Sequence, residues 1–283
     1  MINKITIKNK VKIVNNEYVI KKKTPNINNI YNYLLSRSFN YMPKILKEDE
    51  ENIYYEYIDD IEEPLEQKII DLINLISLLH NKTTFYREID LDYYKFRYEN
   101  IIKRINEVSM FYNNLMEKID SEVYMSPYHY LIARNISLIN NILKHSKIYI
   151  DNWYKSIENS RKERVVLIHG NLSIDHYLKR DKSYLISFDK AEIGSPVTDL
   201  VNLYKTHSLN YDFISLLKIY LSKYPLSNSE MLLFLSIISI PDIVIDEHSE
   251  YKKVLKARRI IDYIYKTNHL LTEYGIKKQP DKN

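Results

Sequence analysis

Residues 165–203 read VVLIHGNLSIDHYLKRDKSYLISFDKAEIGSPVTDLVNL and hold two of the three glycines in this chain of 283 residues. Their apolar runs and polar breaks predict a buried strand at 165–168, a polar loop, a hairpin partner at 184–188, a turn at 194–196 and a helix that begins near Asp199. The two apolar runs end at His169-Gly170 and at Asp189, so both direct polar side chains toward one place. Binding and chemistry commonly reside on loops at the ends of rigid strands, and we therefore expect the functional site here.

The composition indicates a globular protein, with 45% apolar and 28% charged residues. The length predicts one large or two small domains with ample material for a core. The net charge of +4 is mild, and lysines and glutamates are interleaved along the predicted helices. This pattern favours a solvated surface over a nucleic-acid patch, which would need basic residues concentrated on one face.

The chain contains no cysteine, which excludes disulfides, thiolate zinc sites and a cysteine nucleophile. The N-terminal segment MINKITIKNK lacks the apolar core of a signal peptide. The longest apolar run, Met231 to Ile240, is too short to cross a bilayer. We therefore expect a cytoplasmic protein without a membrane partner.

The N-terminal residues 1–60 are predicted to form a β-rich lobe. Asn15-Asn16 supplies a tight turn, and Thr24 and Pro25 predict the cap and first position of a helix that continues to about Leu35, with Ile27, Ile30, Tyr31 and Leu34 on its inner face. The predicted strands cover residues 4–8, 11–14, 17–22, 43–46 and 52–58.

Residues 61–276 are predicted to form a larger, mainly helical lobe in which the segment 165–203 embeds a β-hairpin. Apolar residues at helical spacing predict helices at 64–80, 91–119, 126–153, 199–207, 211–223, 227–239 and 250–271. Residues 277–283 are expected to be a frayed tail. The predicted class is α+β with two lobes, and a cleft between lobes is a common ligand site.

This order of elements, together with three motifs, resembles the aminoglycoside phosphotransferase and choline kinase superfamily, which has the protein-kinase-like fold. The catalytic loop of that family reads H-G-D-x-x-x-x-N, followed by I-D-F-D or I-D-W-E and then G-x-P-x-x-D-L. The matching residues here are His169-Gly170-Asn171 with His176, Ile186 to Asp189, and Gly194 to Leu200. Within the superfamily, the chain looks closest to the CotS/YutH-type spore-coat branch of Gram-positive bacteria.

The resemblance implies ATP and Mg²⁺ or Mn²⁺ as cofactors, because phosphoryl transfer needs a nucleotide-binding lysine, metal-binding oxygens and a base beside the acceptor. The chain departs from the family at five of these positions. Asn171 replaces the base, His176 the metal-binding amide and Ser187 the metal-binding carboxylate. The turn at 9–16 has no glycine to cover phosphates, and residues 24–46 contain no glutamate to pair with the lysine.

Other positions match the family. Lys21 corresponds to the nucleotide-binding lysine, although Lys22 or Lys23 could be the inward residue if the register differs by one. The backbone of Glu56 to Ile58 corresponds to the hinge that meets a purine edge.

His169, Gly170 and Asp199 are expected to be structural, with Asp199 accepting hydrogen bonds from the loop backbone. We favour a buried His169 bonded to Asp199 or to backbone, and His80 as a satisfied core or cap histidine. For Asn171, a loop-capping amide and a substrate contact both stay open.

Asp175, His176 and Asp189 could form a displaced metal site suited to Mn²⁺ or Zn²⁺. Asp189 and Ser187 are two residues apart, so in a strand their side chains would share one face. Asp189 could instead cap the turn to Gly194 and pair with Lys190. In the first alternative Asp189 is also a candidate catalytic residue.

Three functions therefore stay open. The favoured one is a catalytically degenerate, pseudokinase-like binding or scaffold protein that holds a nucleotide, a small-molecule ligand or a protein partner. The second is an active ATP-dependent kinase of a small alcohol or amine with relocated metal ligands. The third is a structural protein of the spore-coat type, which would be associated with spores.

Overall fold

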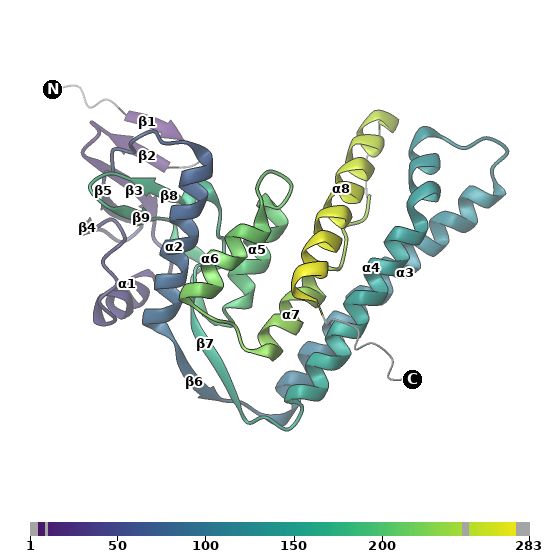
Figure 1. Ribbon diagram of the computed structural model, residues 1–283. Helices are drawn as coiled ribbons and strands as arrows, with labels where there is room; N and C mark the ends of the chain where they lie inside the picture. Colours follow the sequence, from purple (N-terminus) through teal and green to yellow (C-terminus); the bar gives the residue numbers. More distant parts are fainter. Residues whose placement is uncertain (1–4, 9–10, 245–248, 276–283) are drawn as a thin grey trace. The chain divides into compact units, whose positions relative to one another are not determined.

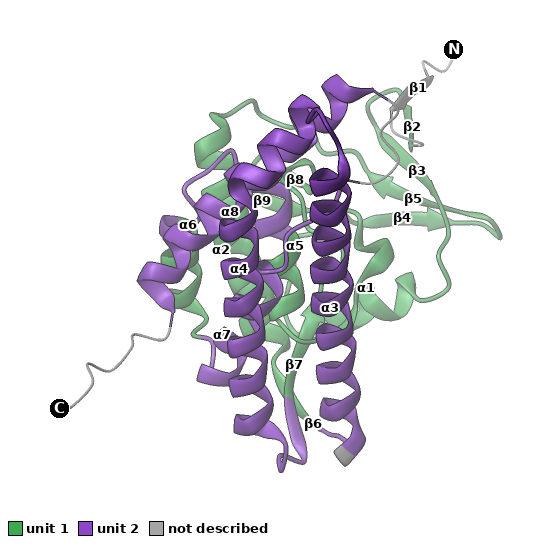
Figure 2. Cartoon of the chain, turned by 90° about the vertical axis from the view of Figure 1, so that its right-hand side faces the viewer, with its two compact units in different colours: residues 1–87, 164–202, 216–225 green, residues 88–163, 203–215, 226–283 purple. Residues whose placement is uncertain are grey.

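The computed structural model describes residues 5–8, 11–244 and 249–275, without the side chains of residues 5–8 and of residue 91 (Figure 1). The chain divides into two compact units (Figure 2). Unit 1 comprises residues 1–87, 164–202 and 216–225, and unit 2 comprises residues 88–163, 203–215 and 226–283. The two units are described separately. This division does not follow the expected boundary at residue 60, which stays a prediction.

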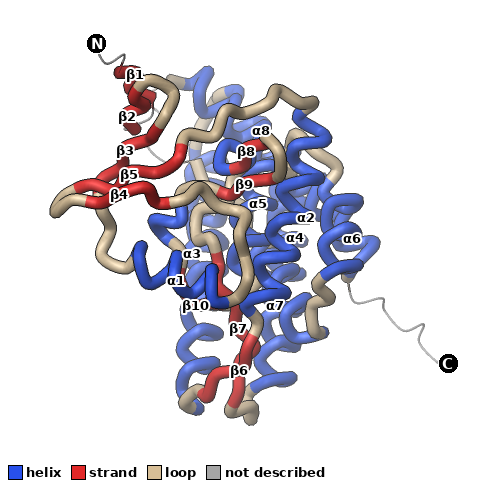
Figure 3. Tube along the Cα trace, turned by 90° about the vertical axis from the view of Figure 1, so that its left-hand side faces the viewer, coloured by secondary structure: helices blue, strands red, loops and turns tan. Residues whose placement is uncertain are grey.

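Unit 1 contains a five-stranded antiparallel sheet with the strand order β1-β2-β3-β5-β4 (Figure 3). The predicted tight turn is present, because Asn15 and Asn16 have φ values of 54° and 56°, a left-handed conformation that asparagine tolerates. The strands are β1 Ile5–Lys8, β2 Val11–Val14, β3 Tyr18–Lys22, β4 Ile45–Glu48 and β5 Asn52–Glu56.

Unit 1 also contains two helices, α1 (Ile27–Ser36) and α2 (Leu65–Thr83). The inner face predicted for α1 is confirmed, since Ile27, Ile30, Tyr31 and Leu34 are all buried. The predicted cap at Thr24 and Pro25 is wrong. The helix begins at Ile27, because the Thr24 carbonyl accepts the Ile27 amide in a turn that precedes it.

The central segment contains two β-pairings rather than the predicted one. Strand β7 (Lys162–Ile168) pairs with β10 (Glu192–Gly194), so Gly194 lies in a strand and not in a turn. Strands β8 (Tyr177–Lys179) and β9 (Ser183–Leu185) pair with each other.

The prediction that residues 184–188 pair with 165–168 is therefore wrong. A tight turn, in which the Arg180 amide donates to the Lys182 carbonyl, gives β9 a nearer partner. The left-handed backbone of Ser187 (φ 68°) then separates β9 from the 3-10 turn η2 (Phe188–Lys190). The predicted embedded hairpin is present, but β8 and β9 form it. The sequence pattern also gave no sign of β6 (Phe85–Glu88), which completes a sheet of order β10-β7-β6.

Unit 2 is built mainly from long helices. Helix α4 packs against α3, α7 and α8. The side chain of Ser126 caps α4 as predicted, because its oxygen accepts the His129 amide at 3.2 Å. The helices are α3 Leu91–Ser121, α4 Pro127–Ile157, α7 Asn228–Ile238 and α8 Glu250–Tyr274, while α5 Val197–His207 and α6 Phe213–Lys223 have residues in both units.

The predicted α+β class is confirmed, with a small antiparallel sheet, one helix beside it and a larger helical part. In the part of the chain that the structure describes, no helix is both long and apolar enough to cross a membrane. The tail at 277–283 lies outside the described residues.

Candidate functional site

Asp199, in the first turn of α5, is the centre of a fully buried polar cluster in unit 1. Its Oδ2 accepts the backbone amide of His169 at 2.7 Å, and its Oδ1 accepts the amide of Gly170 at 3.0 Å. His80 at the end of α2 lies 3.2 Å from Oδ2 through Nε2. These are the backbone hydrogen bonds that the family resemblance implies for Asp199, and they hold the loop after β7 against α5.

The same cluster fixes the protonation of its members. Burial alone would raise the pKa of Asp199, but the interactions with His80 and with His169, including the His169 backbone amide, outweigh it, and the pKa is lowered. Burial lowers the pKa of His169, although Asp199 opposes that shift. His169 Nε2 must donate, because its partner is the Ile186 carbonyl oxygen at 2.8 Å. Its Nδ1 is buried and has no hydrogen-bond partner among the described residues, so the ring is neutral.

Gly170 brings the loop close to η2. Its φ of +74° is left-handed, and a Cβ at this position would collide with the backbone carbonyl oxygen of Lys190. Only glycine avoids both the strain and the collision. The loop after β7 and the turn that carries Asp189 are therefore held in contact by their backbones.

Lys21 of β3 reaches this turn. Its ammonium donates to Ser187 Oγ at 2.7 Å and lies 3.4 Å from Asp189 Oδ2. Lys22 is exposed, and Lys23 pairs with Glu48 at 3.0 Å. Lys21 is thus the residue of the three whose side chain enters the site. The side chains of Lys21 and Asp189 are 18% and 38% exposed, so solvent reaches this contact.

Ser187 occupies an unusual backbone position for a serine, with φ 68° and ψ 50°. Asparagine and aspartate are the non-glycine residues that best tolerate this region. The backbone therefore accepts the aspartate of the family motif, while the side chain supplies a neutral hydroxyl. In this structure that hydroxyl is a hydrogen-bond acceptor for Lys21.

Asn171 and His176 lie together in the loop after β7. His176 Nδ1 donates to the Asn171 carbonyl oxygen at 2.7 Å, because a carbonyl can only accept. The Nε2 atom of His176 is then an unprotonated nitrogen when the ring is neutral. Asn171 is exposed, and its side-chain amide makes no hydrogen bond with any residue that the structure describes. This amide can contact a ligand, but it cannot take up a proton at neutral pH.

The displaced metal site is not assembled in this structure. No group of three or more His, Asp or Glu side chains within the described ranges is arranged to hold a metal ion. Asp175 is exposed, and Asp189 faces Lys21 rather than His176. The sequence spacing cannot reveal this, because η2 replaces the regular strand that would have aligned Ser187 with Asp189.

The hinge segment follows β5. The amide of Glu56 donates to the Lys44 carbonyl at 2.9 Å, and the amide of Tyr57 donates to the Glu17 carbonyl at 3.2 Å. The amide of Ile58 has no hydrogen-bond acceptor among the described residues, although the Ile58 side chain is buried. A backbone donor without a partner at this position can bind a purine nitrogen. The turn before β2 that would cover phosphates includes Asn9 and Lys10, which lie outside the described residues.

Helix α1 has no glutamate, and the residue that it contributes to the site is uncharged. Tyr31 is buried, and its ring lies edge-on to Phe188 at 6.2 Å. Burial raises the pKa of Tyr31 well above its ordinary value, and Tyr55 and Asp189 add to that shift. The phenol therefore stays neutral and cannot replace the charge of a glutamate.

Two features of the site were missed from sequence. His80 is part of the Asp199 cluster, and its Nδ1 lies 2.7 Å from the Tyr220 hydroxyl. The signal was present, because a histidine at the end of an otherwise apolar helix face needs a buried polar partner. The contact of Lys21 with Ser187 had no such signal, since 166 residues separate the two.

Comparisons with known proteins place this geometry in a fold family. No family model matches the sequence. A curated relative, a protein LicA homolog from Mycoplasma capricolum, is 24% identical over 161 residues, which cover 55% of this chain and 66% of that protein, just under two thirds of its length.

Three solved structures share the fold over nearly the whole chain. An aminoglycoside phosphotransferase from Alicyclobacillus acidocaldarius matches with a TM-score of 0.74 and 9% identity, over 96% of this chain and 91% of that one. A spectinomycin phosphotransferase in complex with ADP and spectinomycin matches with a TM-score of 0.54 and 13% identity, over 95% and 92%. A glucosamine kinase in complex with glucosamine, ADP and inorganic phosphate matches with a TM-score of 0.53 and 10% identity, over 96% and 79%. The chain therefore has the protein-kinase-like fold of the aminoglycoside phosphotransferases.

Proposed function

We propose that this chain is a nucleotide-binding protein of the aminoglycoside phosphotransferase fold that lacks the standard groups for phosphoryl transfer. The observation that carries the proposal is the contact of Lys21 Nζ with Ser187 Oγ at 2.7 Å. The Lys21 ammonium contacts a hydroxyl and a carboxylate that solvent reaches, so nucleotide phosphates can approach it. The matching position offers no carboxylate to Mg²⁺, which prefers carboxylate oxygens.

Two further features support nucleotide binding. The Ile58 amide has no acceptor among the described residues, as a hinge donor for adenine requires. Two solved structures with this fold are complexes with ADP and a small molecule, spectinomycin in one and glucosamine in the other. Asn171 supports the lack of phosphoryl transfer, because an amide in the base position can orient an alcohol but cannot deprotonate it.

Thermal unfolding with ATP tests the nucleotide half. We expect ATP to raise the midpoint equally with Mg²⁺ and with EDTA, because a ligand that binds only the folded state stabilises it by about 2.7 kcal/mol at roughly a hundred times its dissociation constant. Lys21→Ala should abolish most of this shift. Lys23→Ala is the matched control, since its surface partner is Glu48. An unchanged midpoint with ATP would refute nucleotide binding.

An assay of γ-phosphate transfer tests whether the protein lacks kinase activity. We expect no transfer of the γ-phosphate to amines or alcohols above the uncatalysed background. Transfer at rates typical of kinases, about 1 s⁻¹ or faster, would show that the protein is an enzyme.

A second candidate is an active small-molecule kinase in which Asp189 holds the metal. It is favoured by one observation, the position of a 38% exposed carboxylate 3.4 Å from Lys21 Nζ. In that case a divalent cation should tighten ATP binding, and Asp189→Ala should abolish this metal-dependent tightening. Metal-independent binding in the unmodified protein would exclude it.

A further inference from the structure

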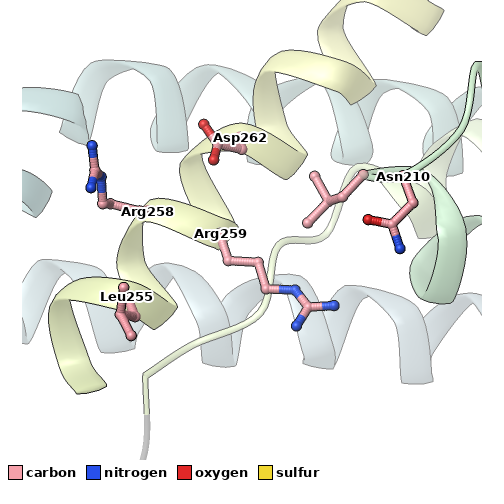
Figure 4. Close-up of a pocket in the computed structure, with 6 residues that line it drawn as sticks. Asn210, Leu255, Arg258, Arg259 and Asp262 are labelled. Carbon is pink, nitrogen blue, oxygen red and sulfur yellow. The ribbon is translucent and has the colours of Figure 1, made fainter. Parts of the chain in front are cut away.

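Unit 2 contains a hollow beside α8 whose lining is rich in basic side chains (Figure 4). Two neighbouring cavities, of ≈ 600 Å³ and ≈ 510 Å³, share Leu209, Leu255 and Arg259 in their linings. We call the two together the α8 pocket. Each cavity has a volume within the range of small-molecule sites.

Five basic residues line the α8 pocket, against two acidic ones, Asp242 and Asp262. Four of the five come from α8, and one comes from the end of α5. They are Lys205, Lys252, Lys256, Arg258 and Arg259.

The spacing along α8 explains why the charges gather on one side. Lys252, Lys256 and Arg259 are four and three residues apart, which places them on one helix face. Like charges at this spacing destabilise a helix, so the face is unfavourable without an anion nearby. Figure 4 shows the Arg259 side chain on the side of α8 nearer to Asn210, whereas Arg258 points away from Asn210.

The described residues offer these five cations few direct partners. Within residues 11–244 and 249–275, none of the five basic side chains has a hydrogen bond or an ion pair. Desolvation by the surrounding atoms lowers the pKa of Lys205, although part of its side chain is exposed; Asp242 opposes this shift and Arg104 adds to it. Among the described lining residues, cations therefore outnumber carboxylates by five to two.

Apolar side chains form the rest of the lining: Leu209, Ile240, Leu255, Ile260 and Tyr263. The Tyr263 hydroxyl donates to the Ile238 carbonyl at 2.7 Å, so this tyrosine offers its ring rather than its hydroxyl proton. A ligand that fits must therefore combine an anionic group with an apolar body.

We propose that the α8 pocket binds a small organic phosphate, with the phosphate at Lys205, Lys256 and Arg259 and the apolar part against Leu209, Leu255 and Ile260. A single carboxylate is satisfied by one arginine fork, whereas several converging cations suit a group with two negative charges. This site is separate from the nucleotide site proposed in unit 1, and neither proposal depends on the other.

Titration calorimetry of the full chain with 1-naphthyl phosphate tests the proposal. We expect saturable binding of one molecule per chain, at least about tenfold tighter than binding of neutral 1-naphthol or singly charged 1-naphthoate, and weaker at high salt. Arg259→Gln should weaken the binding of 1-naphthyl phosphate by about tenfold, the effect of one charge-assisted hydrogen bond. Circular dichroism and the unfolding midpoint establish that each variant is folded.

The matched control is Lys266→Gln, an exposed lysine of the same helix outside the pocket lining, which should change the dissociation constant by less than about twofold. Lys21→Ala separates the two sites and should leave 1-naphthyl phosphate binding unchanged. Absence of binding, equal binding of 1-naphthoate, or a loss in Lys21→Ala that is missing in Arg259→Gln would each overturn the proposal.

Discussion

Two aspartates of the segment 165–203 have different surroundings and make different contacts. At Asp199 a carboxylate is fully buried, accepts two backbone amides and lies beside a histidine. At Asp189, ten residues earlier, a carboxylate is partly exposed and faces one lysine. The first position matches the family motif and fixes the backbone. Asp189 is two residues from Ser187, which stands where the family motif has an aspartate. Its carboxylate is reached by solvent and so by ligands.

This difference shows that a fold can keep its backbone anchors while its chemical groups change. The Asp199 cluster stabilises the loop whether or not a phosphate is transferred, because its partners are protein amides. The ion pair of Lys21 with Asp189 is partly exposed, and such pairs contribute little to stability. Substitutions on the two sides should therefore differ sharply in their effects.

The largest expected effect is the loss of the Asp199 charge. Asp199→Asn keeps the shape but leaves a buried amide of His169 or Gly170 without its charged acceptor. We expect the free energy of unfolding to fall by about 3 kcal/mol. Urea denaturation followed by circular dichroism measures this, and the exposed Asp175→Asn is the control, with an expected change within about 0.5 kcal/mol. Equal changes in both variants would show that Asp199 is not an anchor.

The next effect concerns the glycines of the same segment. Gly170→Ala should destabilise the protein by about 2 kcal/mol, because the left-handed φ and the collision with the Lys190 carbonyl both oppose a Cβ. At Gly194 a Cβ would meet only the end of the Ile168 side chain at 3.2 Å, so Gly194→Ala should cost less than about 1 kcal/mol. If thermal unfolding ranks the two variants the other way, the loop is not held as described.

The elements of the fold were largely predictable, and the errors have local causes. Helices α2, α3, α4, α7 and α8 follow apolar residues at helical spacing, and each was found within a few residues. Periodicity does not identify strand partners, so the pairing of β7 with β10 and of β8 with β9 was missed. Strand β6 has four residues, too few for a pattern to distinguish it from a loop.

The site was predictable only in part. The motif identified Asp199 and Lys21, because their neighbours in sequence carry the resemblance. The motif could not predict that Lys21 donates a hydrogen bond to Ser187 or that His80 contacts Asp199. Both contacts depend on how distant segments pack. The metal site at Asp175, His176 and Asp189 was expected from strand geometry that η2 does not have.

A gain of function tests whether the missing carboxylate at Ser187 is what prevents Mg²⁺ from binding. Ser187→Asp restores a carboxylate at a backbone position that tolerates aspartate. We expect Mg²⁺ to tighten ATP binding by about tenfold in this variant, equivalent to about 1.4 kcal/mol, and to have no effect in the unmodified protein. Ser187→Asn, which has the same shape without the charge, should show no Mg²⁺ dependence in titration calorimetry. A matching gain in Ser187→Asn would refute a metal carboxylate as the missing group.

The smallest expected effect is a dependence of stability on pH that originates at His169. Burial lowers the pKa of the folded His169, while in the unfolded chain its ordinary value is 6.5. The unfolded chain therefore takes up a proton that the folded protein refuses, and stability falls as the pH drops below 6.5. Between pH 7 and pH 6 the loss from this residue should be less than about 1 kcal/mol. The lowered pKa of Asp199 acts in the same direction in a separate window, below its ordinary value of 3.8.

Urea unfolding at the two pH values, with the unmodified protein and His169→Gln, isolates this contribution from the other seven histidines of the chain. The variant should lose less stability than the unmodified protein between pH 7 and pH 6, because glutamine takes up no proton. His176→Gln is the matched control, since that ring is only half-buried and bonds to the Asn171 carbonyl at the loop surface. If His169→Gln keeps the full pH dependence, His169 takes up a proton as readily in the folded protein as in the unfolded chain, and its ring is not held neutral by burial.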